Sequence, residues 1–329
     1  MSVSRFLFRR IALGVASAWL VFTGVFALFT LSQDWALGAR LGMAGYAGAD
    51  EEELEHIEQQ YIEERGLDGA WYEMYVEWLW SLVTLDWGDS FETGEPALTV
   101  VTDAVVTTAT YVIPAVVVAV VLGTVLGMLV SFLRGSGADG ATRALVYLAF
   151  GIPSYWVAAF LMLWIVGDAG ELMFTEERRL FVSYEESPAT WMQYGLASAL
   201  VATILLAGQV SYARAYSLEY LSAEYVTLVR AKGAGAVDVV RHVLRNISLP
   251  LVSLVFTEMI GLLVLAVFVL EMVLGIEGIG ALLLDALWER DLPVIYGSIA
   301  VIITAVIAGN IVQDLSYRYL DPRVGEDAG

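Results

Sequence analysis

The amino-acid sequence predicts an all-α polytopic membrane protein with six transmembrane helices. Of its 329 residues, 58% are hydrophobic and 16% are charged, whereas a soluble domain has about 45–50% apolar and about 25% charged residues. A spanning helix needs about 20 mostly apolar residues. Five uncharged runs meet that need, and a sixth, 249–276, is interrupted only by two glutamates; the other five cover residues 11–33, 104–133, 144–167, 187–213 and 292–313.

The composition excludes several classes of site. There is no cysteine, so disulfides, iron–sulfur clusters and thiolate zinc sites are ruled out. Two histidines, His56 and His242, leave little for a haem or histidine-bound metal. A net charge of −20 opposes a nucleic-acid partner, which needs a basic face. We therefore expect no metal, no cofactor and no nucleic acid, and a lipid bilayer around the apolar runs.

The distribution of lysine and arginine predicts the orientation. With six spans both termini share one side, which carries 12 of the 17 basic residues; the other side carries Arg40, Arg65, Arg178, Arg179 and Arg290. Because basic residues are retained in the cytoplasm, we expect a multi-pass cell-membrane protein with both termini cytoplasmic. The first run lacks a small-residue cleavage site and is not expected to be a signal peptide.

An acidic insertion, 34–103, follows the first span and is too long for a bare loop. Asp50 is placed to cap a helix. A second amphipathic helix is predicted by apolar residues at helical spacing: Trp71, Met74, Tyr75, Trp78, Leu79 and Leu82. This helix could pack on the external face or lie at the lipid interface, where Trp and Tyr collect. We favour a small external helical subdomain over a disordered loop.

These patterns divide the chain into one membrane domain with one insertion. Residues 1–33 form the N-terminal cytoplasmic segment and first span, and 34–103 form the external acidic helical insertion. Residues 104–315 form a core of five helices that includes a long cytoplasmic loop, 214–249. Residues 316–329 form a cytoplasmic tail.

The loop 214–249 predicts two short helices around a glycine break. Gly233 or Gly235 can adopt positive φ and end the first helix. The second helix is expected to have an apolar stripe of Val237, Val240, Leu244 and Ile247, with Pro250 marking entry to the fifth span. The basic residues of the loop suit a docking surface. The alternative is a solvated connector whose charge serves only topology.

Several short motifs follow one another along the chain. The loop carries Tyr225-Val226, Arg230-Ala231-Lys232-Gly233, Arg241-His242, Leu244-Arg245-Asn246 and Leu249-Pro250. Elsewhere stand Asp86-Trp-Gly-Asp-Ser-Phe91, Gly151-Ile-Pro-Ser-Tyr-Trp156, Glu271, Gly278-Ile-Gly280, Arg290-Asp291 and Asp321-Pro-Arg-Val324. With these motifs in this order, the sequence resembles the permease subunits of binding-protein-dependent ABC importers. It is most similar to the dipeptide/oligopeptide branch.

The resemblance implies a type I ABC importer permease fold that forms half of a translocation pathway. It implies a second homologous permease, two ABC ATPase subunits, an extracellular solute-binding protein, and a di- or oligopeptide as solute. The ATPase-coupling residues would be Tyr225, Arg230, Ala231, Lys232, Gly233, Arg241, His242, Arg245, Asn246 and Pro250. The chain has no Gly-x₄-Gly-Lys-Ser/Thr phosphate loop, so we expect no enzyme activity here and ATP hydrolysis on partner subunits.

The two glutamates in the run 249–276, Glu258 and Glu271, are candidate pore carboxylates, since charges within a membrane are costly and often functional. Each could instead be hydrogen-bonded at a helix interface, and for Glu271 we favour that interpretation. An alternative function is an ion-gradient-driven secondary transporter that uses Glu258. An intramembrane protease is disfavoured because no span contains histidine. Gly123 and Gly127 form a GxxxG motif for close helix approach, and Pro114 and Pro153 are expected to kink their helices.

The acidic surplus also needs an explanation. Acidic side chains on the external face could steer a substrate. Abundant Asp and Glu, with 16 arginines and one lysine, also fit a protein from a halophilic organism that faces very high salt. We favour the second interpretation.

Overall fold

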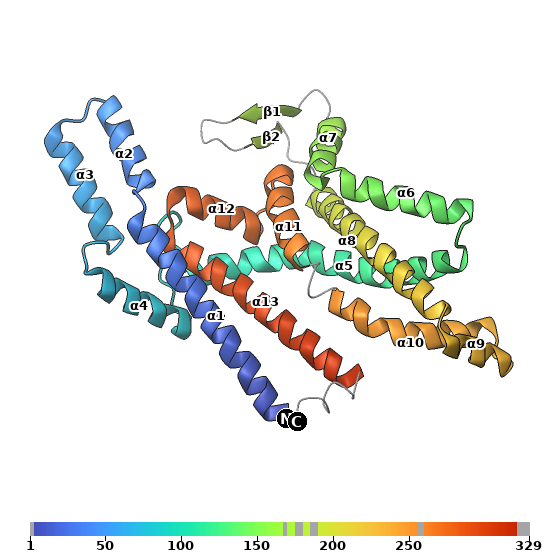
Figure 1. The fold of residues 1–329 in the computed structure, drawn as a ribbon. Helices are drawn as coiled ribbons and strands as arrows, with labels where there is room; N and C mark the ends of the chain where they lie inside the picture. The colour runs from blue at the N-terminus through green and yellow to red at the C-terminus, as the bar shows by residue number, and fades with distance from the viewer. Residues whose placement is uncertain (1–2, 167–169, 175–179, 185–189, 255–259, 321–329) are drawn as a thin grey trace. The chain divides into compact units, whose positions relative to one another are not determined.

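A computed structural model describes residues 3–166, 170–174, 180–184, 190–254 and 260–320, and these are almost wholly helical (Figure 1). The elements are α1 (Val3–Leu31), α2 (Trp35–Tyr46), α3 (Glu51–Glu64), α4 (Trp71–Thr84), α5 (Ala97–Phe132), α6 (Gly137–Gly151), α7 (Ser154–Val166), β1 (Gly170–Phe174), β2 (Leu180–Tyr184), α8 (Thr190–Leu221), α9 (Glu224–Ala231), α10 (Ala236–Leu254), α11 (Ile260–Leu274), α12 (Ile279–Glu289) and α13 (Leu292–Leu320).

The described helices supply four to six membrane spans. Four are long and apolar enough to cross alone, and two bent pairs bring the number to six if each pair is one span. One pair is α6 and α7, which meet at 85° beside Pro153, so the predicted kink at this proline is confirmed. The other joins the end of α11 to α12 at 82°. The helical membrane fold is thereby confirmed, whereas the turn into α12 was not predicted.

A short antiparallel ribbon interrupts the helices between α7 and α8. Strands β1 and β2 pair from Gly170 with Tyr184 to Phe174 with Leu180. No strand was predicted here from the sequence. Two five-residue segments are too short to be distinguished from a loop by their periodicity alone.

The chain divides into two compact units, which are described separately. One contains residues 106–281 and the chain from 308 onward, and the other contains residues 2–105 and 282–307. The boundaries run through α5, α12 and α13. Each unit is therefore assembled from segments that are separated in the sequence.

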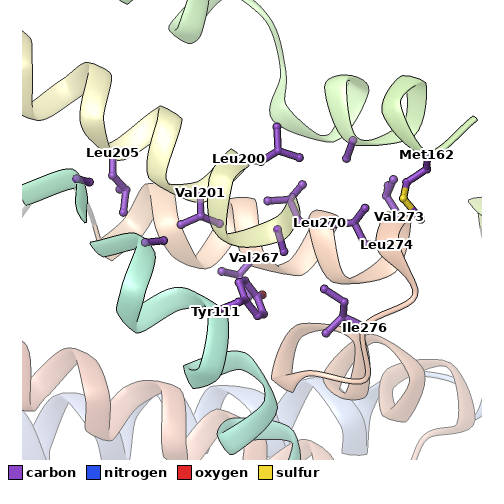
Figure 2. Packing of buried hydrophobic residues seen from close by; sticks show 14 of the residues in the cluster. Tyr111, Met162, Leu200, Val201, Leu205, Val267, Leu270, Val273, Leu274 and Ile276 are labelled. Atoms are coloured by element: carbon purple, nitrogen blue, oxygen red, sulfur yellow. The ribbon is translucent and has the colours of Figure 1, made fainter. Parts of the chain in front are cut away.

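The core of the first unit lies among α5, α7, α8 and α11. Figure 2 shows Tyr111 of α5, Val201 of α8 and Val267 of α11 converging in this cluster. Met162 of α7 and Leu270 of α11 are fully buried beside them. Alanines from α5 and α7 complete the cluster, so large side chains of one helix fill the space above small ones of the next.

The predicted close approach at the GxxxG motif is confirmed between α5 and α8. A Cβ atom on Gly123 would lie 2.6 Å from the Gln209 Cβ, and one on Gly127 would lie 2.6 Å from the Val210 carbonyl oxygen. Gln209 is fully buried, and its Nε2 donates to the Thr124 Oγ1 at 2.9 Å. Small residues let the two backbones meet, and the amide adds a polar contact across them.

In the second unit the insertion forms three helices, α2, α3 and α4. Asp50 caps α3 by accepting from the Glu53 amide at 2.9 Å, and Glu53 reaches back to the Asp50 amide. This reciprocal capping box satisfies two otherwise unpaired donors and confirms the predicted helix start. Asp34 caps α2 through one contact, accepting from the Leu37 amide at 2.9 Å.

Replacing Gly127 with alanine is expected to destabilise the protein by about 1–3 kcal/mol, because the added carbon overpacks the α5–α8 contact. The matched control is Gly24→Ala in α1, where an added Cβ meets nothing within 4 Å. That change should leave the thermal midpoint in detergent unchanged or higher, since alanine favours helix. Equal midpoints for the two variants would contradict the close approach.

Candidate functional site

Helices α9 and α10 form a helical hairpin around Gly233. This glycine has φ +88°, and the Ala234 amide donates to the Val229 carbonyl at 3.3 Å. This is the 6→1 hydrogen bond of a Schellman motif, which ends a helix at a residue with positive φ, usually glycine. The prediction that Gly233 or Gly235 ends the first helix is confirmed, at Gly233.

The start of α10 is held by Asp238. Its carboxylate accepts from the Gly235 amide at 3.2 Å, while the Val239 amide donates to the Gly235 carbonyl at 3.2 Å. A carboxylate in the first turn also complements the positive end of the helix dipole. The turn between the two helices is therefore defined by backbone and capping contacts at both ends.

The inner face of the hairpin is apolar and buried. Val226, Val239, Val243 and Ile247 are at most 3% exposed and pack with Met128 of α5 and Ala213 of α8. The predicted stripe was wrong in part, because Val237 is 80% exposed and Leu244 42% exposed. Apolar residues occur on most sides of this segment, so periodicity alone could not select the buried face. Pro250 lies inside α10 and does not mark the start of a new helix.

The outer face of the hairpin combines cations with exposed apolar side chains. Lys232, Arg241, His242 and Arg245 are exposed, as are Leu228, Val237 and Leu244. Asn246 is exposed as well and donates from Nδ2 to the His242 carbonyl at 2.7 Å. Ala231 is the exposed last residue of α9, and Tyr225 and Arg230 belong to that helix. The structure thus brings the expected coupling residues together on one hairpin.

A buried ion pair ties α8 to the start of α6 shortly before the hairpin. The Arg214 Nε and Nη2 donate to the two Asp139 oxygens at 2.6 and 2.9 Å, and Asp139 is 2% exposed. Asp139 also accepts from the Gly135 amide at 3.0 Å. A bidentate pair of this kind fixes orientation as well as distance. This pair was not predicted, although the Ser136-x-x-Asp139 spacing indicates a helix start.

Glu271 is fully buried at the bend between α11 and α12. Its Oε1 accepts from the Thr108 hydroxyl at 2.5 Å and the Tyr111 hydroxyl at 2.8 Å. Its Oε2 accepts from the Gly280 and Ala281 amides at 2.7 and 3.0 Å. The carboxylate therefore pairs the first amides of α12, which have no partner within their own helix.

The Gly278-Ile-Gly280 motif makes room for this carboxylate. A Cβ on Gly278 would overlap the Glu271 carboxyl group, and one on Gly280 would lie 2.7 Å from the Phe268 Cα. Thr108 also accepts from the Ile279 amide at 2.9 Å. Glu271, Gly278 and Gly280 thus lie in contact with one another at the start of α12. The other candidate pore carboxylate, Glu258, lies outside the described residues.

In the second unit Arg290 donates to carbonyl groups at the end of a helix, whereas Glu271 accepts from amide groups at the start of one. It lies between α12 and α13 with φ +55° and is 7% exposed. Its guanidinium donates to the Phe29 and Gln33 carbonyls at the end of α1 and forms an ion pair with Asp34 at 3.2 Å. One cation thus pairs carbonyls that α1 leaves open and the acid that begins α2.

Tyr61 extends this network into α3. Its hydroxyl donates to Asp34 at 3.0 Å and accepts from the Arg65 Nη1 at 2.8 Å. Burial raises the pKa of the Tyr61 phenol to about 12 against the pull of Arg65, so the phenol keeps the proton that it donates. Arg65 also donates to the Glu289 and Arg290 carbonyls at 3.2 and 3.1 Å. The insertion is thereby fastened to the end of α12.

The Asp86–Phe91 motif meets the Arg290-Asp291 motif in the same unit. The Ser90 hydroxyl donates to Asp291 at 2.6 Å, and Asp291 also accepts from the Val294 amide at the start of α13. Trp87 covers Gly297, where a Cβ would overlap the indole ring. These residues, separated by about 200 positions in sequence, are structural partners.

Comparison with known proteins agrees with these motifs. Residues 119–326 match the family described as "Binding-protein-dependent transport system inner membrane component". A putative peptide transport system permease protein of Brucella abortus is 28% identical over 285 residues, covering 85% of this chain and 87% of the relative. The dipeptide transport system permease protein DppB of Escherichia coli K12 is 27% identical over 303 residues, covering 86% and 88%.

A third relative is more distant. The inner membrane ABC transporter permease protein YejB of Escherichia coli O157:H7 is 24% identical over 289 residues, covering 85% of this chain and 78% of the relative. The family match covers more than half of the sequence and includes the whole α9–α10 hairpin, Glu271 and Arg290. The chain therefore belongs to the family of inner-membrane components of binding-protein-dependent transport systems.

Proposed function

We propose that this chain is the permease subunit of an ATP-driven ABC importer, completed by a second homologous permease and energised by two separate ATPase subunits. The observation that carries the proposal is the two-faced α9–α10 hairpin. Its inner face packs on α5 and α8 through side chains that are almost fully buried. Its outer face leaves three apolar and four basic side chains exposed.

These two faces suit the transmission of movement. Packed cores rearrange as units and do not deform continuously. A partner that displaces the hairpin would therefore displace α5 and α8 with it. The exposed apolar residues would pack against the partner as the core of an interface, and the basic residues around them suit its polar rim. The Asp139–Arg214 pair would keep α6 and α8 moving together.

We further propose that the chain crosses the cell membrane with both termini and the α9–α10 hairpin in the cytoplasm. The distribution of basic residues supports this orientation. It places α3, whose exposed side chains include Glu51, Glu52, Glu55 and Glu58, on the outer face. That surface is the candidate docking site for the extracellular solute-binding protein.

The proposed solute is a di- or oligopeptide. Two of the relatives carry peptide or dipeptide transport in their names and align with more than four fifths of this chain. We expect the solute-binding protein, which receives the solute first, to select it. A binding assay on that partner is therefore the direct test of the solute.

Arg241→Glu is expected to reduce both co-purification of the ATPase and ATP-dependent uptake at least about tenfold, equal to about 1.4 kcal/mol of binding. The charge reversal places an acid on the outer face without touching the buried face. Val237→Asp should act in the same way. The control is Arg143→Glu, the same reversal at an exposed position of α6. If both hairpin variants bind ATPase and transport as the control does, the docking role is wrong.

We also propose that Glu271 serves the scaffold and does not contact solute. Each buried donor left without an acceptor costs about 1–3 kcal/mol, and Glu271→Leu would leave several unpaired. The variant should therefore lose several kcal/mol of stability, measured as the thermal midpoint. Glu277→Leu, an exposed carboxylate in the same bend, is the control and should change little. A Glu271→Gln variant with normal stability but altered solute range would restore the pore interpretation.

Finally, we propose that the acidic surplus is an adaptation to high salt. Lowering salt from about 1 M to about 0.1 M lengthens the Debye length from about 3 to about 10 Å, so the acids of α3 would repel one another over longer range. The thermal midpoint should fall as salt is removed. An unchanged midpoint would favour the alternative that the acids steer a substrate.

A further inference from the structure

Helix α4 has an exposed face that does not suit water. Four apolar side chains, Tyr72, Val76, Trp80 and Val83, are each 55–77% exposed and follow one another along a single stripe. A helix that faces solvent is expected to be polar on this side. Contiguous exposed apolar surface usually marks a site of interaction.

The acids of α4 occupy a different side. Glu73 and Glu77 are exposed and lie about 90° around the helix from the apolar stripe, at about 100° per residue. The opposite side packs inward, with Trp78 7% exposed. Helix α4 therefore has three sides: a packed face, an uninterrupted apolar face and a narrow acidic edge.

Contacts with α1 indicate the depth of α4. Trp78 stacks on Phe26 with centroids 5.4 Å apart and meets Phe22 edge-on at 5.9 Å. The Tyr75 hydroxyl is 2.6 Å from the Thr23 Oγ1. At about 1.5 Å per residue, Phe26 and Phe22 lie about 7 and 13 Å before the end of α1 at Leu31. These α1 residues stand in the second half of an apolar run long enough to span a bilayer.

A second helix gives the same depth independently. Trp78 contacts Tyr296 of α13 with ring centroids 4.4 Å apart. Tyr296 lies four residues, or about 6 Å, inside the candidate span that begins at Leu292. The contacts with α1 and with α13 both place α4 beside residues that lie inside these apolar spans. They do not place it beyond the ends of the spans, as an external subdomain would be.

We propose that α4 is embedded in the half of the bilayer reached by the C-terminal end of α1, with Tyr72, Val76, Trp80 and Val83 against lipid acyl chains and Glu73 and Glu77 toward the headgroups and water. Helix α1 also has exposed apolar side chains, with Leu20 62% and Leu28 70% exposed. Tryptophan and tyrosine are the residues enriched at membrane interfaces. A helix of this build lies in the membrane without crossing it.

The expected external insertion is thereby revised: the acidic helix α3 stays outside the membrane, and α4 returns into it. It does not depend on the direction of transport or on the solute. It depends only on α1 and α13 being spans, so a failure of the proposed coupling role would leave it standing.

The chain contains no cysteine, so single-cysteine variants can be spin-labelled without background. Val76→Cys and Val83→Cys report on the apolar stripe, in the transport complex purified through this chain and reconstituted in phosphatidylcholine nanodiscs. Val21→Cys on α1 is the lipid reference, and Glu55→Cys on α3 is the water reference, both at exposed positions. Collision rates with oxygen and with a water-soluble nickel chelate are measured at each site.

The logarithm of the oxygen-to-nickel collision ratio should be positive at positions 76 and 83, as at 21, and negative at 55. Values at 76 and 83 that match position 55 would overturn the proposal in favour of a solvated external helix. Labels that are immobile and reached by neither reagent would overturn it in favour of a second protein subunit covering the stripe.

Discussion

The constraint on which this structure depends is that a helix ending in or beside a membrane must have its last backbone groups paired. No water is present in the hydrocarbon to do so. Glu271 supplies two acceptors to the first amides of α12. Arg290 supplies donors to carbonyls at the end of α1. Carboxylates therefore stand at helix starts and a guanidinium stands at a helix end, as the helix dipole also favours.

This constraint explains what the family motifs encode. Arg290-Asp291 closes one helix and begins the next, and Gly278-Ile-Gly280 leaves space for the carboxylate that begins α12. Each of these contacts joins a helix end to another part of the same chain. The motifs can therefore be explained as parts of the scaffold. The outer face of the α9–α10 hairpin differs from these motifs, because its apolar and basic side chains are exposed.

The sequence predicted features that depend on neighbours along the chain. Apolar runs, the Asp50 cap and the positive φ near Gly233 are local, and all three are found. Features that depend on distant partners were not predictable. Asp139 and Arg214 are 75 residues apart, and nothing between them indicates their pairing. The buried face of α10 was assigned wrongly in part, because its valines surround the helix and tertiary contact alone selects Val239 and Val243.

Two helices with exposed apolar side chains illustrate how such faces are distinguished. On α10 the cation Arg241 lies between Val237 and Leu244 on one side of the helix, so any covering surface must offer polar and apolar groups together, as a protein does. On α4 the apolar stripe is continuous and the acids keep to a separate edge. A lipid chain offers only apolar contact, so it suits the second arrangement and disfavours the first. The interleaving of charge is thus the physical argument behind both proposals, a protein partner for α10 and the bilayer for α4.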